Sequence, residues 1–258
     1  MSALLNLSVE QLMLWFGTIW WPFIRLSAFF WALPVYDNPA VTPRARIVLA
    51  LFLSFLLSAG LEVPAVDPFS VQGAIVTLEQ ILFAVIMACA VRMLFEVLAL
   101  VGLMISMQMG LSMAMMMDPG SGDQVSVLSQ LFWIMTALLF FALDGHLISL
   151  HLLVDSFVLW PVGSSLYQLD LTLLLKLFGW MFGAALLVAL PAVIAMLLVN
   201  LTFGVASRSA PSMNLFSLGF PMTLLLGFVC VLLTLGQMGE HFFTLSEYVL
   251  LQMQQAMQ

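Results

Sequence analysis

The sequence predicts an all-α membrane protein, a polytopic arrangement of helical hairpins with about six long helices. Of its 258 residues 64% are hydrophobic and only 7% are charged, whereas an ordinary soluble domain has about 25% charged residues. The apolar runs are continuous and much longer than the roughly ten-residue alternating strands of an outer-membrane barrel. A chain of this composition is expected to cross a bilayer as several helices, or to be part of a helical assembly that behaves like a membrane protein during insertion.

The charged residues exclude several classes of protein. Six lysines and arginines stand against thirteen acidic residues, and no basic stripe is present, so nucleic acid is not an expected partner. Cys89 and Cys230 lie inside apolar runs and are interpreted as small buried hydrophobic residues, not as a disulfide or a metal site. Because no basic segment precedes the first apolar run, a cleaved signal peptide is not expected.

The first two helices are predicted from apolar runs on either side of a polar loop. Residues 12–35 contain four tryptophans, which are enriched at water–lipid boundaries and are interpreted as interfacial anchors. A loop over residues 36–46 with two prolines and two arginines leads to a second run over residues 47–61. Because the chain shows no linker, low-complexity segment or exact repeat, we expect a single domain over residues 1–258.

The next run, residues 74–117, is too long for one membrane crossing. At about 1.5 Å per residue it is roughly twice the length that a bilayer requires. It is therefore either two segments or one very long helix that rises out of the membrane plane. Gly102 and Gly110 are the candidate breaks.

The second half of the chain contains the remaining predicted helices. Residues 125–143 and 147–160 lie on either side of a turn at Asp144-Gly145. Residues 171–203 form another long run, a small polar segment follows, and residues 215–235 form the last long run before a mildly amphipathic tail.

A methionine-rich segment lies in the middle of the chain. Seven of the fourteen residues 104–117 are methionine, and Asp118-Pro119-Gly120 follows directly. Methionine is unbranched and polarizable, so a cluster of it re-packs around variable shapes. The composition alone fits both a deformable seal and an ordinary core filler.

Ionisable residues inside apolar runs need an explanation, because they are costly at membrane depth unless they are paired or face water. Arg92 and Glu96 are four residues apart, share a helix face and can pair. They are interpreted either as a structural ion pair between helices or as part of a polar conduit.

No motif predicts an enzyme, a cofactor or a metal site. The spacing of Asp144, His146, His151 and Asp155 does not match a helical metal-binding pair. The sequence also lacks a nucleophile motif, a phosphate-binding loop and a dinucleotide-binding fingerprint.

Four short motifs follow one another along the chain. They are Asn38-Pro39-x-Val41-x-Pro43-x-Ala45-Arg46; Gln108-Met-Gly110 with Asp118-Pro119-x-Ser121-Gly122; Phe141-Ala-Leu-Asp144-Gly145-His146 with Ser156-Phe157 and Pro161; and Gly204-x3-Arg208-x2-Pro211-x2-Asn214-x-Phe216-x2-Gly219-Phe220-Pro221. In this order, on a chain of this length, they resemble the FliR/SctT family of type III secretion export gates. The resemblance is to the flagellar branch more than to the injectisome branch.

The resemblance implies a function in protein export. Proteins of this family form a cone-shaped helical gate with FliP-like and FliQ-like subunits at the bacterial inner membrane, in the flagellar basal body. The gate passes unfolded flagellar proteins and works with FlhB-like and FlhA-like components. Its helices rise above the bilayer, which would explain the over-long apolar runs.

The resemblance also implies a plug loop between Gln108 and Gly122. Its expected channel lining is Met109, Leu111, Met113, Met115, Met116 and Met117. Gly110 and Gly120 would let the loop swing aside, and Asp118-Pro119 would mark the end of its mobile part. Methionine stands here where some relatives have aromatic residues, so a softer seal is expected. Internal packing without pore contact is the alternative.

The remaining candidate residues are assigned to assembly or structure. Pro211 would stop one helix and Asn214 would cap the next, while Arg208 would pair with carbonyls or a partner's carboxylate. The others are Arg92, Glu96, Asp144, Gly145 and His146. Two other functions stay open: a small-solute transporter, although no symmetric halves are visible, and an intramembrane enzyme near Asp144.

Overall fold

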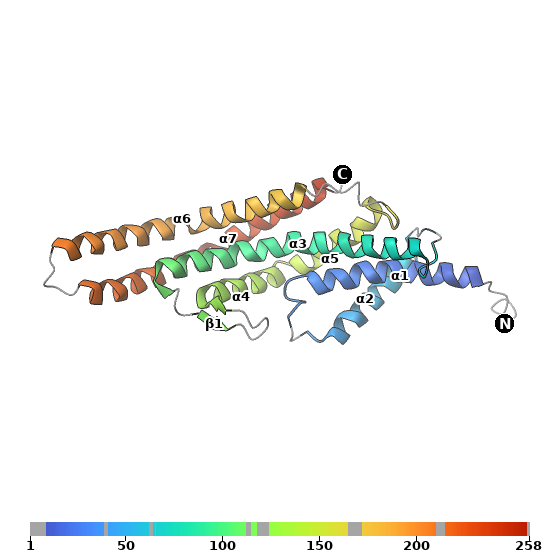
Figure 1. Ribbon diagram of the computed structural model, residues 1–258, viewed down its shortest axis with the longest axis horizontal. Coiled ribbons are helices and arrows are strands. Elements are labelled where there is room, and N and C mark those ends of the chain that lie inside the picture. Colours follow the sequence, from blue (N-terminus) through green and yellow to red (C-terminus); the bar gives the residue numbers. More distant parts are fainter. Residues whose placement is uncertain are drawn as a thin grey trace. The chain divides into compact units, whose positions relative to one another are not determined.

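The computed structural model describes residues 9–38, 41–61, 64, 66–111, 115–117, 124–164, 172–209 and 215–256. Over these residues the chain forms seven helices and two strands of three residues each, so the predicted all-α class is confirmed (Figure 1). The elements are α1 (Val9–Ala32), α2 (Pro43–Ser58), α3 (Val71–Gln108), β1 (Met115–Met117), β2 (Gln124–Ser126), α4 (Val127–Ala142), α5 (Gly145–Leu159), α6 (Thr172–Ser209) and α7 (Leu215–Ala256).

The chain divides into two compact units built from interleaved segments. Unit 1 contains Met1–Arg92, Asp144–Leu174 and Leu251–Gln258, and unit 2 contains Met93–Leu143 and Leu175–Leu250. The units are therefore not successive sequence domains. The expectation of a single domain over residues 1–258 stays a prediction.

Three helices are far longer than a bilayer requires. Helices α3 and α6 have 38 residues each and α7 has 42, which corresponds to roughly 57–63 Å against a hydrocarbon core of about 30 Å. By length and composition, the described residues contain three candidate membrane spans, or four if α4 and α5 form one broken span. The long run after residue 74 is thus one helix and not two segments.

The three candidate spans differ in how far the protomer itself covers them. The most apolar stretch of α3 is 61% buried, compared with 28% for α6 and 22% for α7. Helix α3 is therefore a core helix, whereas most of the apolar surface of α6 and α7 needs cover from lipid or from other proteins.

Of the two predicted breaks, one is confirmed and one is wrong. Gly110 follows the end of α3 and has φ of +74°, the left-handed conformation that commonly terminates helices. Gly102 lies inside α3 and does not interrupt it. A Cβ atom there would lie only 2.6 Å from the Leu128 carbonyl oxygen, so this glycine lets the backbone of α4 approach α3 closely.

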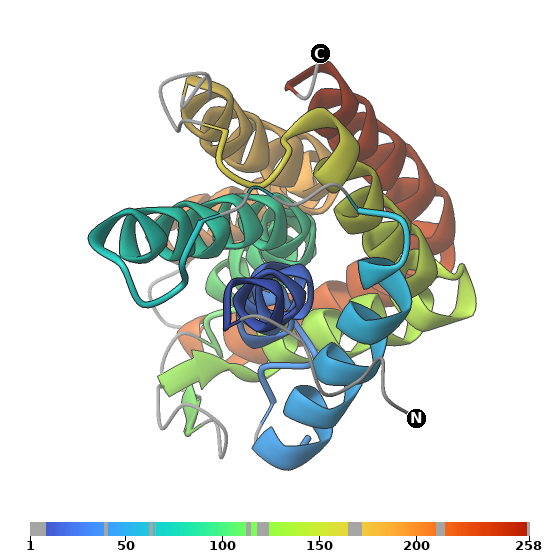
Figure 2. The ribbon, with the colours of Figure 1, turned by 90° about the vertical axis from the view of Figure 1, so that its right-hand side faces the viewer.

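In unit 1, α2 lies beside α1 (Figures 1 and 2). Its buried apolar cluster joins Trp21 of α1, Val76 of α3, Phe157 of α5 and Val162, which follows α5. Helix α2 begins at Pro43, a residue that suits the first turn because its missing N–H has no partner there in any helix.

In unit 2, α4 runs beside the second half of α3, and the Ser129 hydroxyl donates a 2.9 Å hydrogen bond to the Ala99 carbonyl (Figure 1). Helices α6 and α7 form an antiparallel hairpin. At one end the rings of Trp180 and Tyr248 stack with centroids 4.8 Å apart. Toward the other end, Gly219 faces Phe203.

The two strands form an antiparallel pair between the end of the methionine-rich segment and the residues before α4. Met115 pairs with Ser126, Met116 with Val125 and Met117 with Gln124. Strand β1 therefore lies within the predicted plug loop, and β2 follows the end of that loop at Gly122. This pair is the only strand structure in the described residues.

Candidate functional site

The methionine-rich segment is fixed to the rest of unit 2 at its base, where α3 ends. Met109 follows the last residue of α3, and its N–H donates to the Ile105 carbonyl at 3.0 Å. Its side chain is fully buried. It packs directly onto the backbone of α7 at Gly227, where a Cβ atom would lie 2.6 Å from the Met109 sulfur.

The next residue, Gly110, marks where the helical backbone gives way to the loop. Its N–H donates to the Met107 carbonyl at 3.2 Å. A Cβ at Gly110 would lie 3.5 Å from the ring of Phe220 at the start of α7. The positive φ of Gly110 disfavours any other residue, so the turn depends on glycine.

A third contact joins the same junction to α6. The Asn200 side-chain amide donates a long hydrogen bond, 3.4 Å, to the Gln108 carbonyl. That carbonyl is one of the last four of α3, which have no partner within the helix. Helices α6 and α7 thus both contact the end of α3.

A cavity of about 420 Å³ lies at this junction. Its lining includes Gln108, Gly110, Asn200, Phe203, Gly219 and Phe220. The junction is therefore packed tightly on the side of Gly227 and loosely on the side of the cavity.

The predicted lining residues are placed as follows. Met109 is buried, Gly110 is exposed and Leu111 is half-buried. Met115, Met116 and Met117 form β1. Met113, Asp118, Pro119 and Gly120 lie outside the described residues. For Met109 the structure gives internal packing; the role of the other methionines as channel lining stays a prediction.

Unit 1 contains a polar cluster around Arg25, a fully buried residue of α1. Its guanidinium donates to the Gln80 side chain at 2.8 Å, to the Ser156 carbonyl at 3.0 Å and to the Trp160 carbonyl at 2.9 Å. It also lies 4.1 Å from the ring centre of Phe157. The two carbonyls belong to the last turn of α5 and its cap, where the helix dipole favours a cation.

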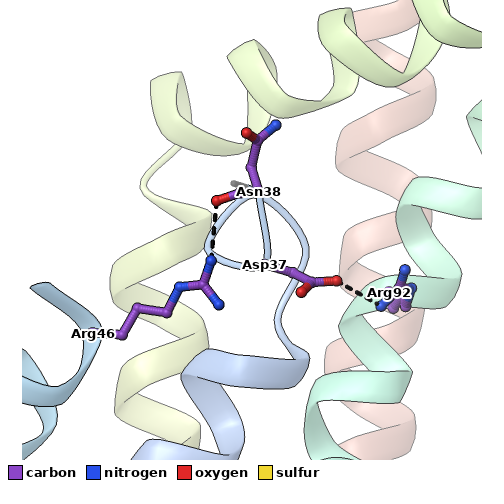
Figure 3. Close-up of polar contacts among 4 residues, drawn as sticks. All are labelled: Asp37, Asn38, Arg46 and Arg92. Carbon is purple, nitrogen blue, oxygen red and sulfur yellow. Dashed lines mark hydrogen bonds and ion pairs between the residues drawn. The ribbon is translucent and has the colours of Figure 1, made fainter. Parts of the chain in front are cut away.

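The ion pair that the structure gives Arg92 is with Asp37, at 3.5 Å, and not with Glu96 as the spacing predicted (Figure 3). Asp37 lies in the loop after α1, and both side chains are about half exposed. The pair therefore connects that loop to α3. The structural interpretation of Arg92 expected an ion pair of this kind, but with Glu96 as the carboxylate.

The same loop is held from the other side by Arg46, as Figure 3 shows. The Arg46 guanidinium donates to the carbonyls of Asn38 and Val41 at 3.0 Å each, and lies over the ring of Trp31. These contacts give the first sequence motif a structural explanation. Its arginine closes the loop that joins α1 to α2.

Asp144 separates α4 from α5 in the left-handed conformation, with φ of 55° and ψ of 24°. The predicted turn at Asp144-Gly145 is thereby confirmed, and α5 begins at Gly145. His151 and Asp155 lie 3.7 Å apart on the surface of α5. Among the described residues, no group of histidines, cysteines and carboxylates is arranged to hold a metal ion.

The fourth motif joins α6 to α7. Helix α6 ends at Ser209, after Arg208, and α7 begins at Leu215, directly after Asn214. These bounds agree with a hairpin turn at this position. Pro211 and Asn214 lie outside the described residues, and their roles stay predictions.

Sequence reasoning missed Gly227, Asn200, Asp37 and Gln80, and gave Arg25 no role. Arg25 alone had a usable signal, because it is the only charged residue of the first apolar run and such a residue needs partners. No signal in the sequence marks the other four, because their partners come close to them only in the folded structure.

Together these features define a helical membrane protein in which the apolar surfaces of α6 and α7 need external cover. The family described as "Bacterial export proteins, family 1" matches residues 16–248. The chain therefore belongs to this family of bacterial export proteins, the FliR/SctT family, as its four motifs predicted.

Individual relatives are similar over almost the whole chain. Flagellar biosynthetic protein FliR of Pectobacterium carotovorum subsp. carotovorum is 32% identical over 89% of this chain and 90% of its own. FliR of Escherichia coli K12 is 30% identical over 93% and 94%. Surface presentation of antigens protein SpaR of Shigella flexneri is 28% identical over 86% and 90%.

Proposed function

We propose that the chain is the FliR-type subunit of a flagellar type III export gate in the bacterial inner membrane. It forms a channel with FliP-like and FliQ-like subunits, works with FlhB-like and FlhA-like components, and passes unfolded flagellar proteins. The observation that supports this most is the full-length similarity to flagellar FliR proteins. The exposed apolar surfaces of α6 and α7 support a subunit that functions inside a larger helical assembly.

The methionine-rich plug loop is proposed as the barrier to ions. An apolar constriction blocks ions because it excludes water, and flexible thioether side chains still yield to a passing polypeptide. The support is the position of this segment: a short hairpin that follows a firmly held helix end, as a movable closure requires.

Co-purification tests the assembly. The tagged chain, extracted from membranes of its own organism, should bring FliP-like and FliQ-like subunits with it, and its deletion should abolish flagellar filaments. A tagged chain that purifies as a stable monomer, in an organism that keeps its flagella without it, would refute the proposal.

Serine replacement of Met113, Met115, Met116 and Met117 tests the barrier. The assembled gate should then leak ions, measured as loss of membrane potential in cells without export substrate. The control is Met107→Ser with Met222→Ser, two methionines that are exposed and outside the loop. An intact complex with unchanged conductance would show that the methionines are not the barrier.

The alternative is the corresponding subunit of an injectisome. The similarity to SpaR supports it, although SpaR is less identical to this chain than FliR of Pectobacterium carotovorum and of Escherichia coli are. Deletion distinguishes the two, because an injectisome subunit leaves motility intact and abolishes secretion of virulence proteins.

A further inference from the structure

Helix α2 exposes most of its apolar surface. Its exposed large hydrophobic residues are Ile47, Val48, Leu49, Leu51, Phe52, Phe55 and Leu56. At about 100° per residue they span roughly 200° of the helix circumference. The buried residues, Arg46, Ala50 and Ser54, form one narrow edge. Because a single packed helix covers a stripe of about 100°, one further helical neighbour would leave part of the apolar surface of α2 uncovered.

The polar side chains of α2 beyond its first turn are satisfied within the helix itself. The Ser54 hydroxyl donates to the Leu51 carbonyl at 2.8 Å, and the Ser58 hydroxyl donates to the Phe55 carbonyl at 2.7 Å. No charged residue follows Arg46 before the end of α2. This part of the helix therefore presents no side-chain donor that needs a polar partner outside it, as a helix in contact with lipid requires.

Both charges of α2 lie at its N-terminal end. Arg46 is buried, and its guanidinium donates to the carbonyls of Asn38 and Val41, the first of which Figure 3 shows. Arg44 is exposed. It lies four residues before Val48, so the two side chains share one face of the helix. The guanidinium of Arg44 is therefore placed at one end of the exposed apolar surface.

An exposed tryptophan marks the same end of α2. Trp31, in the last turn of α1, is 62% exposed, and the Arg46 guanidinium lies 5.4 Å from its ring centre. Asp37, the acidic residue of the loop between these helices, pairs with Arg92 and not with Arg44. An exposed cation and an exposed indole next to an apolar surface suit the boundary between anionic headgroups and acyl chains.

From these observations we infer that α2 is embedded in lipid and that Arg44 binds the phosphate of an anionic phospholipid. The acyl chains cover the exposed apolar surface, and Trp31 lies at the level of the headgroups. A guanidinium suits this ligand because it stays charged and donates to two phosphate oxygens at once. Helix α2, with 16 residues, is thus a lipid-facing helix in addition to the candidate spans. The inference goes beyond the proposed function, since it requires a membrane but no role in export.

Photo-crosslinking in native membranes identifies what covers α2. The photoreactive residue p-benzoylphenylalanine replaces Val48, Phe52 or Phe55, one at a time, in the complete complex. We expect adducts heavier by one phospholipid, identified by mass spectrometry, at two or three of these positions. The control is the same replacement of Phe29, a buried aromatic residue of α1, which should give no lipid adduct. Adducts with other protein subunits at two or three positions would overturn the inference.

Arg44→Gln tests the phosphate site. With the photoreactive residue at position 48, one turn from Arg44, the ratio of anionic to zwitterionic phospholipid in the adducts is measured. An arginine near the membrane surface attracts anionic lipid, so Arg44→Gln should lower this ratio about fivefold, whereas Arg44→Lys should retain most of it.

The matched control is Lys176→Gln, which removes one exposed cation from α6 and should leave the ratio unchanged. The phosphate site is refuted if parent and Arg44→Gln give equal ratios, or if Lys176→Gln lowers the ratio as much as Arg44→Gln does.

Co-purification separates this inference from the proposed function. The FliP-like and FliQ-like subunits that accompany each variant are measured in the same membranes. Lipid adducts on α2 without these subunits would refute the proposed gate and leave the lipid-facing surface supported. Complete complexes in which α2 gives only protein adducts would support the gate and overturn the lipid-facing surface.

Discussion

Arg25 in unit 1 and Met109 in unit 2 are both completely buried, yet they are held by opposite means. Arg25 is fixed by directional hydrogen bonds to three different partners, whereas Met109 is held by packing against the backbone of α7 at Gly227. Removing the first leaves buried polar groups without partners. Removing the second leaves only a cavity.

The comparison shows what each contact requires of its partners. A buried polar group that loses its partner costs about 1–3 kcal/mol, and more if it is charged. Removal of a buried methionine costs about 2–5 kcal/mol, because its contacts are lost and a cavity is left. Both sites therefore contribute to stability, but Arg25 requires acceptors at defined positions, whereas Met109 requires only space beside the backbone at Gly227.

Replacing Arg25 tests the fixed side of this comparison and should have the largest effect. Arg25→Leu leaves the side-chain oxygen of Gln80 and the Trp160 carbonyl without this donor, whereas the Ser156 carbonyl keeps its bond from the Trp160 N–H. We expect a loss of about 3 kcal/mol or more. The thermal midpoint of the purified complex, and the yield of protein in membranes, should both fall sharply.

Arg25→Lys is the matched control. Lysine keeps the charge but lacks the planar fork that reaches several acceptors, so its stability should lie between those of the parent and of Arg25→Leu. If leucine is tolerated as well as lysine, the hydrogen bonds of Arg25 contribute little, and the contrast with Met109 disappears.

A smaller effect is expected at Gly102, where the backbones of α3 and α4 lie close together in unit 2. In Gly102→Ala the new Cβ would lie 2.6 Å from the Leu128 carbonyl oxygen, so α3 and α4 must separate. Overpacking of this kind costs about 1–3 kcal/mol. The thermal midpoint measures it, with Gly183→Ala as control because a Cβ there meets nothing within 4 Å. Equal midpoints would refute the close approach.

The smallest effect is expected at the ion pair of Asp37 and Arg92. Both side chains are about half exposed, and exposed pairs contribute about 0–1 kcal/mol. Asp37→Asn should therefore lower stability slightly, and the difference should shrink at high salt. A double-mutant cycle with Arg92→Gln measures the coupling. A loss as large as that of Arg25→Leu would mean that polar contacts in unit 1 matter irrespective of burial.

Local features of the fold were predictable from the sequence because they depend on neighbouring residues. Gly110, one of two candidate breaks within the apolar run of residues 74–117, marked the end of α3, and Asp144-Gly145 predicted the turn between α4 and α5. Gly102 shows the limit of this reasoning. A glycine inside an apolar run is consistent both with a helix break and with a close contact to another helix. The two are distinguished only by whether another helix packs against that glycine.

The candidate site was predictable only in its position along the chain. The methionine-rich segment was identified, but not the burial of Met109, because its partner Gly227 lies on another helix. Arg92 was assigned the carboxylate four residues away, whereas the loop after α1 provides a different one. Such contacts depend on distances in space, which sequence spacing reports only within one helix.

The hydrogen bonds of Arg25 also constrain how the protein is made. Its partners Ser156 and Trp160 are synthesised 131 and 135 residues later, and a lone cation in hydrocarbon is unfavourable by several kcal/mol. Until α5 has been synthesised, the guanidinium therefore lacks these acceptors and is stable only in contact with water. The buried core of unit 1 is thus completed only when α5 packs against α1.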